Sequence, residues 1–190
     1  YRGFAPTNWA IINGKTESGA TMFLMAETVD SGPIIDQRSF PIGPNDTIRD
    51  VEANVTDAYL TLLTSNVDAL LANEFTTTPQ DHSAATLTTK RVPADGEIDW
   101  TKSASSIHNL IRALTDPWPG AFTSVGGKKL MIWSSRKYEG IEPIGSVPGR
   151  VVDLSMSPAV TVATGDGAIV IESVQIEDGT VVGAAEVIRS

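Results

Sequence analysis

With 190 residues, 41% of them hydrophobic and 19% charged, the chain has the composition of a globular protein with one large core or two small ones. Its net charge of −9 argues against a large polyanionic partner, because phosphate neutralisation by Lys and Arg supplies most of the affinity for nucleic acid. No apolar run is long enough to span a bilayer, and the absence of cysteine excludes disulfides and thiolate chemistry, so we expect a cytoplasmic protein.

The first third of the chain predicts a strand pair and a long helix. Residues 21–25 form a short apolar run typical of a buried strand, and residues 34–42 alternate in polarity until Pro41. Between them, residues 30–33 read Asp-Ser-Gly-Pro, a turn sequence, so we expect a hairpin or a bent ribbon. Apolar residues at helical spacing then predict a helix over about 47–73.

The remainder predicts a polar connection, a second helix and a series of strands. Residues 74–98 are rich in threonine and predict an extended connection, and a helix over 100–114 is ended by Pro-Trp-Pro-Gly at 117–120. Short apolar runs at hairpin spacing follow, which predict a small barrel of the OB type. The expected strands are 121–125, 129–134, 149–154, 159–163 and 168–176.

Few residues have a pattern that indicates catalysis. The two histidines, His82 and His108, lack the acid or serine spacing of a triad and are more often structural or solvated. Two histidines without cysteine argue against a metal site, and no phosphate-binding glycine loop is present. Asp30 follows an apolar stretch at a strand end, where a side chain can face a cleft. An Asx-turn cap is an equally good interpretation of Asp30.

Two groups of motifs, one in each half of the chain, carry a family resemblance. The first group is Tyr1-Arg2-Gly3-x-Ala5-Pro6-x-Asn8-Trp9, Asn13-Gly14, Gly19-x-Thr21 and Asp30-x-Gly32. The second is Gly96-x-Ile98-Asp99-Trp100, Arg112-Ala113-x-x-Asp116-Pro117-Trp118-Pro119-Gly120-Ala121-Phe122, Trp133-Ser134-Ser135-Arg136, Pro148-Gly149 and Gly165-Asp166-Gly167. Together they resemble the folate-dependent formyltransferases, which include methionyl-tRNA formyltransferases and enzymes that modify sugar nucleotides.

The resemblance implies an α/β fold with two domains. Residues 1–118 correspond to the C-terminal portion of a Rossmann-like formyltransferase domain with a linker helix, and residues 119–190 to an OB-like C-terminal β-barrel domain. The wording around His108 and Asp116 is most similar to the formyltransferase domain that modifies UDP-4-amino-4-deoxy-L-arabinose. The resemblance therefore implies transfer of a formyl group from 10-formyltetrahydrofolate to the amino group of a sugar nucleotide, without a metal.

The resemblance also assigns roles to residues. Asp30 matches the catalytic aspartate of the family, and Arg2 and Gly3 match acceptor-side or loop-shaping positions. Arg2 fits a structural ion pair as well as a phosphate contact. A pterin-contacting wall, built mostly from backbone groups, corresponds to Met25, Ala26, Glu27, Thr28 and Val29, with Ala26 replacing an aspartate and Thr28 a glycine of the tRNA enzymes.

The family's catalytic Asn and His precede a Leu-Leu-Pro segment that runs directly into the counterpart of Tyr1. We therefore expect the chain to be a fragment that lacks these two groups and is inactive alone. Methionyl-tRNA formyltransferase and a non-catalytic binding module remain alternative interpretations. The expected partners are a sugar nucleotide and a folate, rather than tRNA or a membrane, and an oligomer is compatible with the sequence.

Overall fold

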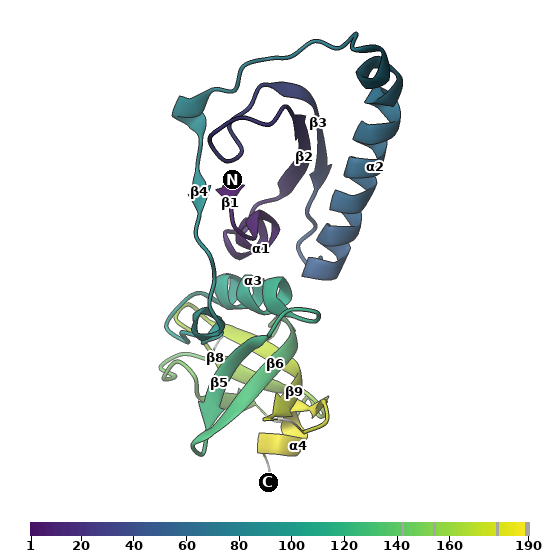
Figure 1. Ribbon diagram of the computed structural model, residues 1–190. Helices are drawn as coiled ribbons and strands as arrows, with labels where there is room; N and C mark the ends of the chain where they lie inside the picture. The colour runs from purple at the N-terminus through teal and green to yellow at the C-terminus, as the bar shows by residue number, and fades with distance from the viewer. Residues whose placement is uncertain (142, 154, 178, 189–190) are drawn as a thin grey trace. The chain divides into compact units, whose positions relative to one another are not determined.

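The computed structural model describes residues 1–141, 143–153, 155–177 and 179–188, which divide into two compact units. The N-terminal unit contains Tyr1–Ala10 and Lys15–Arg91, and the C-terminal unit contains Ile11–Gly14 and the chain from Val92 onwards (Figure 1). The sequence instead predicts a domain boundary after residue 118. Compact units need not coincide with family domains, so that boundary stays a prediction.

The N-terminal unit is built on an antiparallel strand pair covered by one long helix. Strands β2 (Glu17–Phe23) and β3 (Ile34–Pro41) pair antiparallel, and helix α2 (Ile48–Ala72) packs against both (Figure 1). Buried residues of β2 and α2 form a cluster there: Ala20, Ala58 and Leu62. The predicted hairpin and the predicted helix are both confirmed, with the helix ends within one residue of expectation.

A capping interaction fixes the start of α2. The backbone amide and the hydroxyl of Thr47 both donate hydrogen bonds to one carboxylate oxygen of Asp50, at 2.8 and 2.6 Å. At the other end, Asn73 adopts a left-handed conformation with φ 55°, which stops the helix. The hydroxyl of Thr47, followed by its backbone amide, holds the pKa of Asp50 below its ordinary value.

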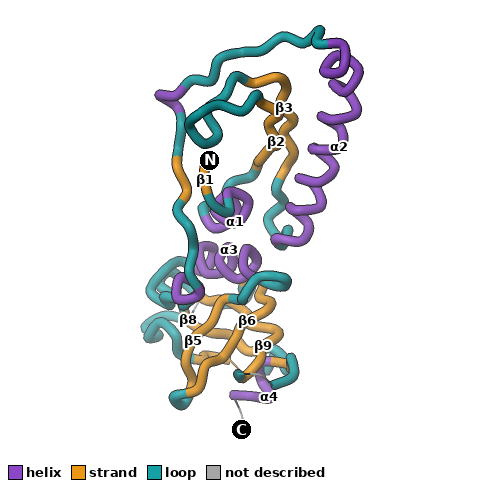
Figure 2. The backbone as a smooth tube through the Cα atoms, viewed as in Figure 1, coloured by secondary structure: helices purple, strands orange, loops and turns teal. Residues whose placement is uncertain are grey.

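The polar connection after α2 returns to the start of the chain. It contains the 3₁₀ helices η1 (His82–Ala84) and η2 (Pro93–Gly96) and the short strand β4 (Leu87–Thr88), which pairs in parallel with β1 (Arg2–Gly3) (Figure 2). Helix α1 (Pro6–Ile12) follows β1. The sequence did not indicate α1, β1 or β4, because such short elements show no measurable periodicity.

The C-terminal unit is an antiparallel sheet with two helices. The strands are β5 (Ala121–Val125), β6 (Lys128–Lys137), β7 (Val151–Asp153), β8 (Val160–Ala163), β9 (Ala168–Ile176) and β10 (Val182–Gly183). Their order is β5-β6-β9-β8-β7, with β10 beside β9 (Figure 1). The helices are α3 (Ala104–Leu114) and α4 (Ala184–Ile188). The five predicted strands are present, although Leu154, the expected end of one of them, lies outside the described residues.

The predicted small barrel of the OB type is confirmed in part. Among the described residues, the strand order ends at β5 and β7, which do not pair with each other, so the sheet is a curled half-barrel. The outer side of β5 is bridged instead by Glu97, which pairs with Phe122. Closure requires edge strands long enough to pair, and β7 has only 3 residues. Buried side chains of α3 and α4, including Ile107, Ile111 and Ala184, complete the core with the strands instead.

The Gly165-Asp166-Gly167 motif has a structural role in this unit. A carboxylate oxygen of Asp166 accepts a hydrogen bond from the backbone amide of Ala104, at 2.7 Å, and so caps α3 from a distant loop. A Cβ at Gly165 would lie 1.9 Å from the carbonyl oxygen of Thr101, so only glycine fits. Ser103 is the N-cap residue, which explains why α3 begins at Ala104 rather than at residue 100.

No helix in the described ranges combines the length and the apolar character that a membrane crossing requires.

Replacing Asp50 with Asn tests the capping interaction. A carboxylate with a lowered folded-state pKa stabilises the fold above its unfolded pKa, and this contribution disappears as the pH falls through the folded pKa. We expect Asp50→Asn to cost about 0.5–1 kcal/mol at pH 7. The difference from the parent chain should shrink below about pH 4. Thermal unfolding followed by circular dichroism measures it, with the exposed mid-helix change Asp57→Asn as control. A difference that is independent of pH would contradict the interaction.

Candidate functional site

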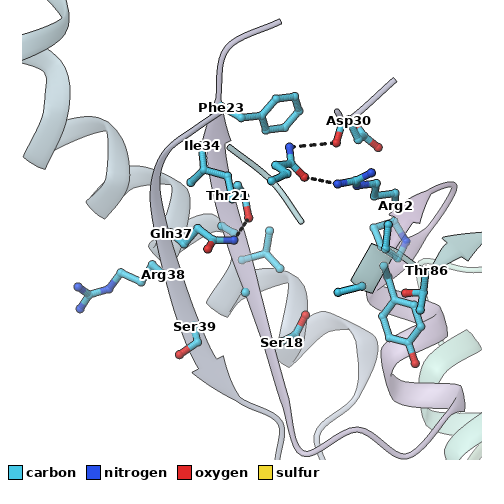
Figure 3. A pocket seen from close by; sticks show the side chains of 18 of the residues that line it. Arg2, Ser18, Thr21, Phe23, Asp30, Ile34, Gln37, Arg38, Ser39 and Thr86 are labelled. Carbon is cyan, nitrogen blue, oxygen red and sulfur yellow. Dashed lines mark hydrogen bonds between the residues drawn. The ribbon is translucent and has the colours of Figure 1, made fainter. Parts of the chain in front are cut away.

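A cavity of about 960 Å³ lies within the N-terminal unit. Strands β2 and β3 form one wall, where Thr21 and Gln37 are linked by a hydrogen bond of 2.9 Å. Arg2 and Asp30 lie on the opposite side (Figure 3). The cavity therefore faces the one aspartate that the sequence singled out.

A tight loop from residue 24 to residue 33 delivers Asp30 to the cavity. The amide of Leu24 donates to the carbonyl oxygen of Pro33 at 3.0 Å, which closes the loop at its base. A Cβ at Gly32 would lie 1.6 Å from the carbonyl oxygen of Leu24, so a side chain at this position would force the loop open. The Asp30-x-Gly32 spacing is thus explained by a close approach of two backbone segments.

Asp30 itself is half-buried and has a left-handed backbone, with φ 56°. Aspartate tolerates this conformation better than most residues. One of its carboxylate oxygens accepts a hydrogen bond from the backbone amide of Gly3 at 3.2 Å. The carboxylate thus bonds to a distant segment rather than to its own turn, which favours the cleft-facing interpretation over the Asx-turn cap.

Gly3 is held in place by the parallel pairing of β1 with β4. The amide of Arg2 donates to the carbonyl oxygen of Thr86 at 2.8 Å, and the Thr88 hydroxyl donates to the carbonyl oxygen of Arg2 at 2.9 Å. Gly3 has φ 105°, and a Cβ there would lie 2.6 Å from the carbonyl oxygen of Thr88. Glycine is therefore required at position 3, and the pairing aims its amide at Asp30.

The guanidinium of Arg2 contacts two side chains, Gln80 and His82. It donates to the amide oxygen of Gln80 and lies 3.2 Å from Nδ1 of His82. Because arginine only donates, Nδ1 of His82 accepts, which places the ring proton on Nε2. Neither contact is the ion pair considered from the sequence, and the phosphate contact of Arg2 stays a prediction.

The expected pterin-contacting residues lie on the outer part of the same loop. Met25, Ala26, Glu27, Thr28 and Val29 are all exposed, with Met25 at 96% and Val29 at 77% of their full accessibility. These five residues do not line the cavity that Asp30 faces. Their role in folate binding stays a prediction.

Gln80 belongs to the site although the sequence did not indicate it. Its side-chain amide donates to the carbonyl oxygen of Asp30 at 3.1 Å and to that of Gly32. Gln80 lies in the polar connection, which has no periodic pattern, so only the folded arrangement brings it to Asp30. His108, in contrast, is buried in the C-terminal unit, where its Nδ1 lies 3.0 Å from the Ser135 hydroxyl.

The charged groups that line the cavity are mixed in sign. Glu17, Asp30 and Asp81 supply carboxylates, and Arg2 and Arg38 supply guanidinium groups. The Ser83 hydroxyl and amide hold the pKa of Asp81 below its ordinary value, so it stays ionised at neutral pH. In the part of the chain that the structure describes, no three His, Cys, Asp or Glu side chains lie close enough to hold a metal ion. The site is thus suited to proton transfer and hydrogen bonding.

Comparison with known families gives two matches. Residues 90–190 match the family model described as formyl transferase, C-terminal domain, and residues 1–67 match the model described as formyl transferase. The first match covers more than half of the chain.

Solved structures share the fold. HypX from Aquifex aeolicus in complex with tetrahydrofolic acid is 24% identical with a TM-score of 0.75, over 98% of this chain and 32% of that chain. The N-formyltransferase from Helicobacter canadensis in complex with folinic acid and dTDP-3-aminofucose is 24% identical with a TM-score of 0.71, over 93% and 62%. Methionyl-tRNA formyltransferase from Clostridium thermocellum is 21% identical with a TM-score of 0.57, over 73% and 59%. The chain thus spans between a third and two thirds of these proteins.

Replacing Gly32 with Ala tests the closed loop. The added methyl group collides with the carbonyl of Leu24, so we expect a loss of about 1–3 kcal/mol in unfolding free energy. Faster proteolytic cleavage within residues 24–33 should accompany it. Ser31→Ala is the control, since it removes a single hydrogen bond to Thr28 in the same loop and should cost about 1 kcal/mol or less. Parent-like stability and protease resistance of Gly32→Ala would refute the close approach.

Proposed function

The chain belongs to the formyl transferase family, and we propose that it acts in the transfer of a formyl group from 10-formyltetrahydrofolate to a primary amine. One observation carries the proposal: the half-buried Asp30 carboxylate faces a cavity at the Asp-x-Gly position that the family motif assigns to catalysis. The complexes of HypX with tetrahydrofolic acid and of the Helicobacter canadensis enzyme with folinic acid support a folate co-substrate.

The transfer requires a proton to move from the amine to the leaving nitrogen. The amine nitrogen attacks the formyl carbon, the bond from that carbon to N10 of the folate breaks, and N10 leaves with a proton. The Asp30 carboxylate accepts the amine proton directly or through water. Hydrogen bonding to Gly3 leaves the second oxygen of this carboxylate available for that step. A carboxylate beside a family histidine also favours the imidazolium form, which donates to the oxyanion.

We assign folate contact to residues 25–29. All five residues are exposed, so a ligand can reach this segment. The carbonyl oxygen of Thr28 accepts a hydrogen bond from the Ser31 hydroxyl, which orders the loop from within. Backbone recognition of folate would tolerate Ala26 and Thr28 in place of the aspartate and glycine of the tRNA enzymes.

The acceptor we propose is a sugar nucleotide such as UDP-4-amino-4-deoxy-L-arabinose, with Arg2 and Gly3 on the acceptor side. The motif wording around Asp116 supports this acceptor, as does the dTDP-3-aminofucose bound to the Helicobacter canadensis enzyme. The net charge of −9 disfavours the alternative acceptor, methionyl-tRNA. On this proposal, the N-terminal unit corresponds to the end of a Rossmann-like domain.

A non-catalytic binding module is the remaining alternative. The C-terminal unit has an apolar cavity of about 220 Å³ lined by strand residues and Trp100, which would suit a small apolar ligand. Such a module would bind without turnover, so measured formyl transfer separates the two functions.

Replacing Asp30 tests the proposed catalysis. In the gene product that contains this chain, Asp30→Ala should lower the rate of formyl transfer to UDP-4-amino-4-deoxy-L-arabinose by about 10²–10⁴-fold. Asp36→Asn is a matched control, because that carboxylate lies on β3, bonds to Asn66 and does not line the cavity. It should keep the parental rate within a few-fold. A near-parental rate for Asp30→Ala would remove Asp30 from the mechanism.

Salt dependence separates the two acceptors. Between 50 and 200 mM salt, binding of tRNA should weaken by about 10³–10⁵-fold, because several phosphates release counterions. A sugar nucleotide carries only two phosphates, so its affinity should change by about tenfold or less over the same range of salt. Equilibrium binding of both acceptors to the same gene product, at matched pH, measures the slopes. Tight, steeply salt-dependent binding of Met-tRNA would favour the tRNA enzyme.

A further inference from the structure

The backbone at Asp30 has a left-handed conformation that hydrogen bonds from other segments can hold in place. Asp30 has φ 56° and stands on a loop whose outer residues, 25–29, are exposed. The hydrogen bond from Gly3 holds the carboxylate but not the backbone that carries it. The base of the loop is closed by the Leu24–Pro33 hydrogen bond, and the carbonyl groups of residues 30 and 32 are held separately.

The side-chain amide of Gln80 holds both of these carbonyl groups. Its nitrogen donates to the oxygens of Asp30 and Gly32, and its oxygen accepts from the Arg2 guanidinium. In Figure 3, one dashed line ends at Asp30 and another ends at Arg2, and they mark these two hydrogen bonds. Carbonyl groups only accept and arginine only donates, so the amide can be satisfied in this one orientation.

Gln80 is itself anchored to the strand pair rather than to the loop. Two residues before it, Thr78 exchanges both backbone hydrogen bonds with Ile34, each at 2.8 Å, at the first residue of β3. The Gln80 side chain is half-buried. A side chain fixed to β3 thus reaches across to the loop and holds two of its carbonyl oxygens.

Building on the proposed function, we propose that Gln80 is a positioning residue, which clamps the left-handed turn at residues 30–32 and thereby directs the Asp30 carboxylate to the reacting amine. Without the donor nitrogen, two carbonyl groups lose their partner and the turn relaxes toward ordinary backbone angles. The Asp30 carboxylate then moves away from Gly3. Because a shift of about 1 Å in a reacting group costs up to 10²-fold in rate, loss of the clamp lowers the rate through the position of the Asp30 carboxylate.

Replacing Gln80 with Glu tests the clamp, since it keeps the size and the acceptor for Arg2 but removes the donor. Gln80→Met removes both functions without adding charge. In the gene product that contains this chain, both variants should lower kcat by about 10–100-fold. Gln80→Glu, which keeps the acceptor for Arg2, should leave KM for both substrates within about threefold. The matched control is Gln175→Glu, because Gln175 accepts from Trp133 and donates to the carbonyl oxygen of Gly179 in the C-terminal unit. It should leave kcat unchanged.

Combining variants separates positioning from general damage. In an Asp30→Ala background, Gln80→Glu should lower kcat no further, because the group that it positions is absent. An additive loss, or a rise in KM that accounts for the whole effect, would overturn the positioning role.

A spectroscopic measurement on the gene product that contains this chain tests the clamp without relying on the proposed activity. In ¹H–¹⁵N spectra, Asp30→Ala should move the amide resonance of Gly3, which donates to Asp30. Gln80→Glu should move it toward the same position, while the amides of Arg2 and Phe4 stay, since they bond to β4 and its flank. A Gly3 resonance unchanged in Gln80→Glu overturns the clamp. If the Gly3 resonance shifts in Gln80→Glu but the parent gene product shows no formyl transfer, the clamp stands and only the proposed function is overturned.

Discussion

The candidate site depends on backbone hydrogen bonds that join segments far apart in the sequence. The amide of Gly3 donates a hydrogen bond to the Asp30 carboxylate, and the Gln80 side chain donates one to the Asp30 carbonyl oxygen. Both partners are far from Asp30 in the sequence. Parallel pairing of β1 with β4 and the bridge between Ile34 and Thr78 bring these segments together. Each pairing spans only one or two residues, so the site is held by specific bonds and not by a large apolar interface.

The C-terminal unit is stabilised in a different way. Its core consists of alternating strand residues packed with α3 and α4, including Val160, Ile169 and Val174 with no exposed surface. Burial of this kind is non-directional and tolerates local variation in the loops. The Asp166 cap on α3 is an added constraint on the helix start. The C-terminal unit is thus stabilised mainly by its apolar core, whereas the candidate site in the N-terminal unit is held mainly by individual hydrogen bonds.

Glycines carry much of the family resemblance, and their reasons differ from one position to another. Gly32 is required by space, because the carbonyl of Leu24 occupies the position of a side chain. Gly3 is required both by its positive φ and by the carbonyl of Thr88. Gly165 leaves room for the carbonyl of Thr101 and serves the C-terminal unit only. A shared glycine motif therefore indicates a similar backbone conformation. It indicates a similar chemistry only where a functional side chain such as Asp30 belongs to the motif.

The sequence by itself determined the elements with a clear period: the ribbon of β2 and β3, helix α2 and the antiparallel strands of the C-terminal unit. Local propensity and side-chain alternation act within a few residues, so they can be read without the fold. Family motifs also singled out Asp30. Only the tertiary structure decided that the barrel stays open and that Gln80 joins the site. Edge-strand pairing and contacts between residues 3, 30 and 80 depend on distances across the fold, which no local pattern encodes.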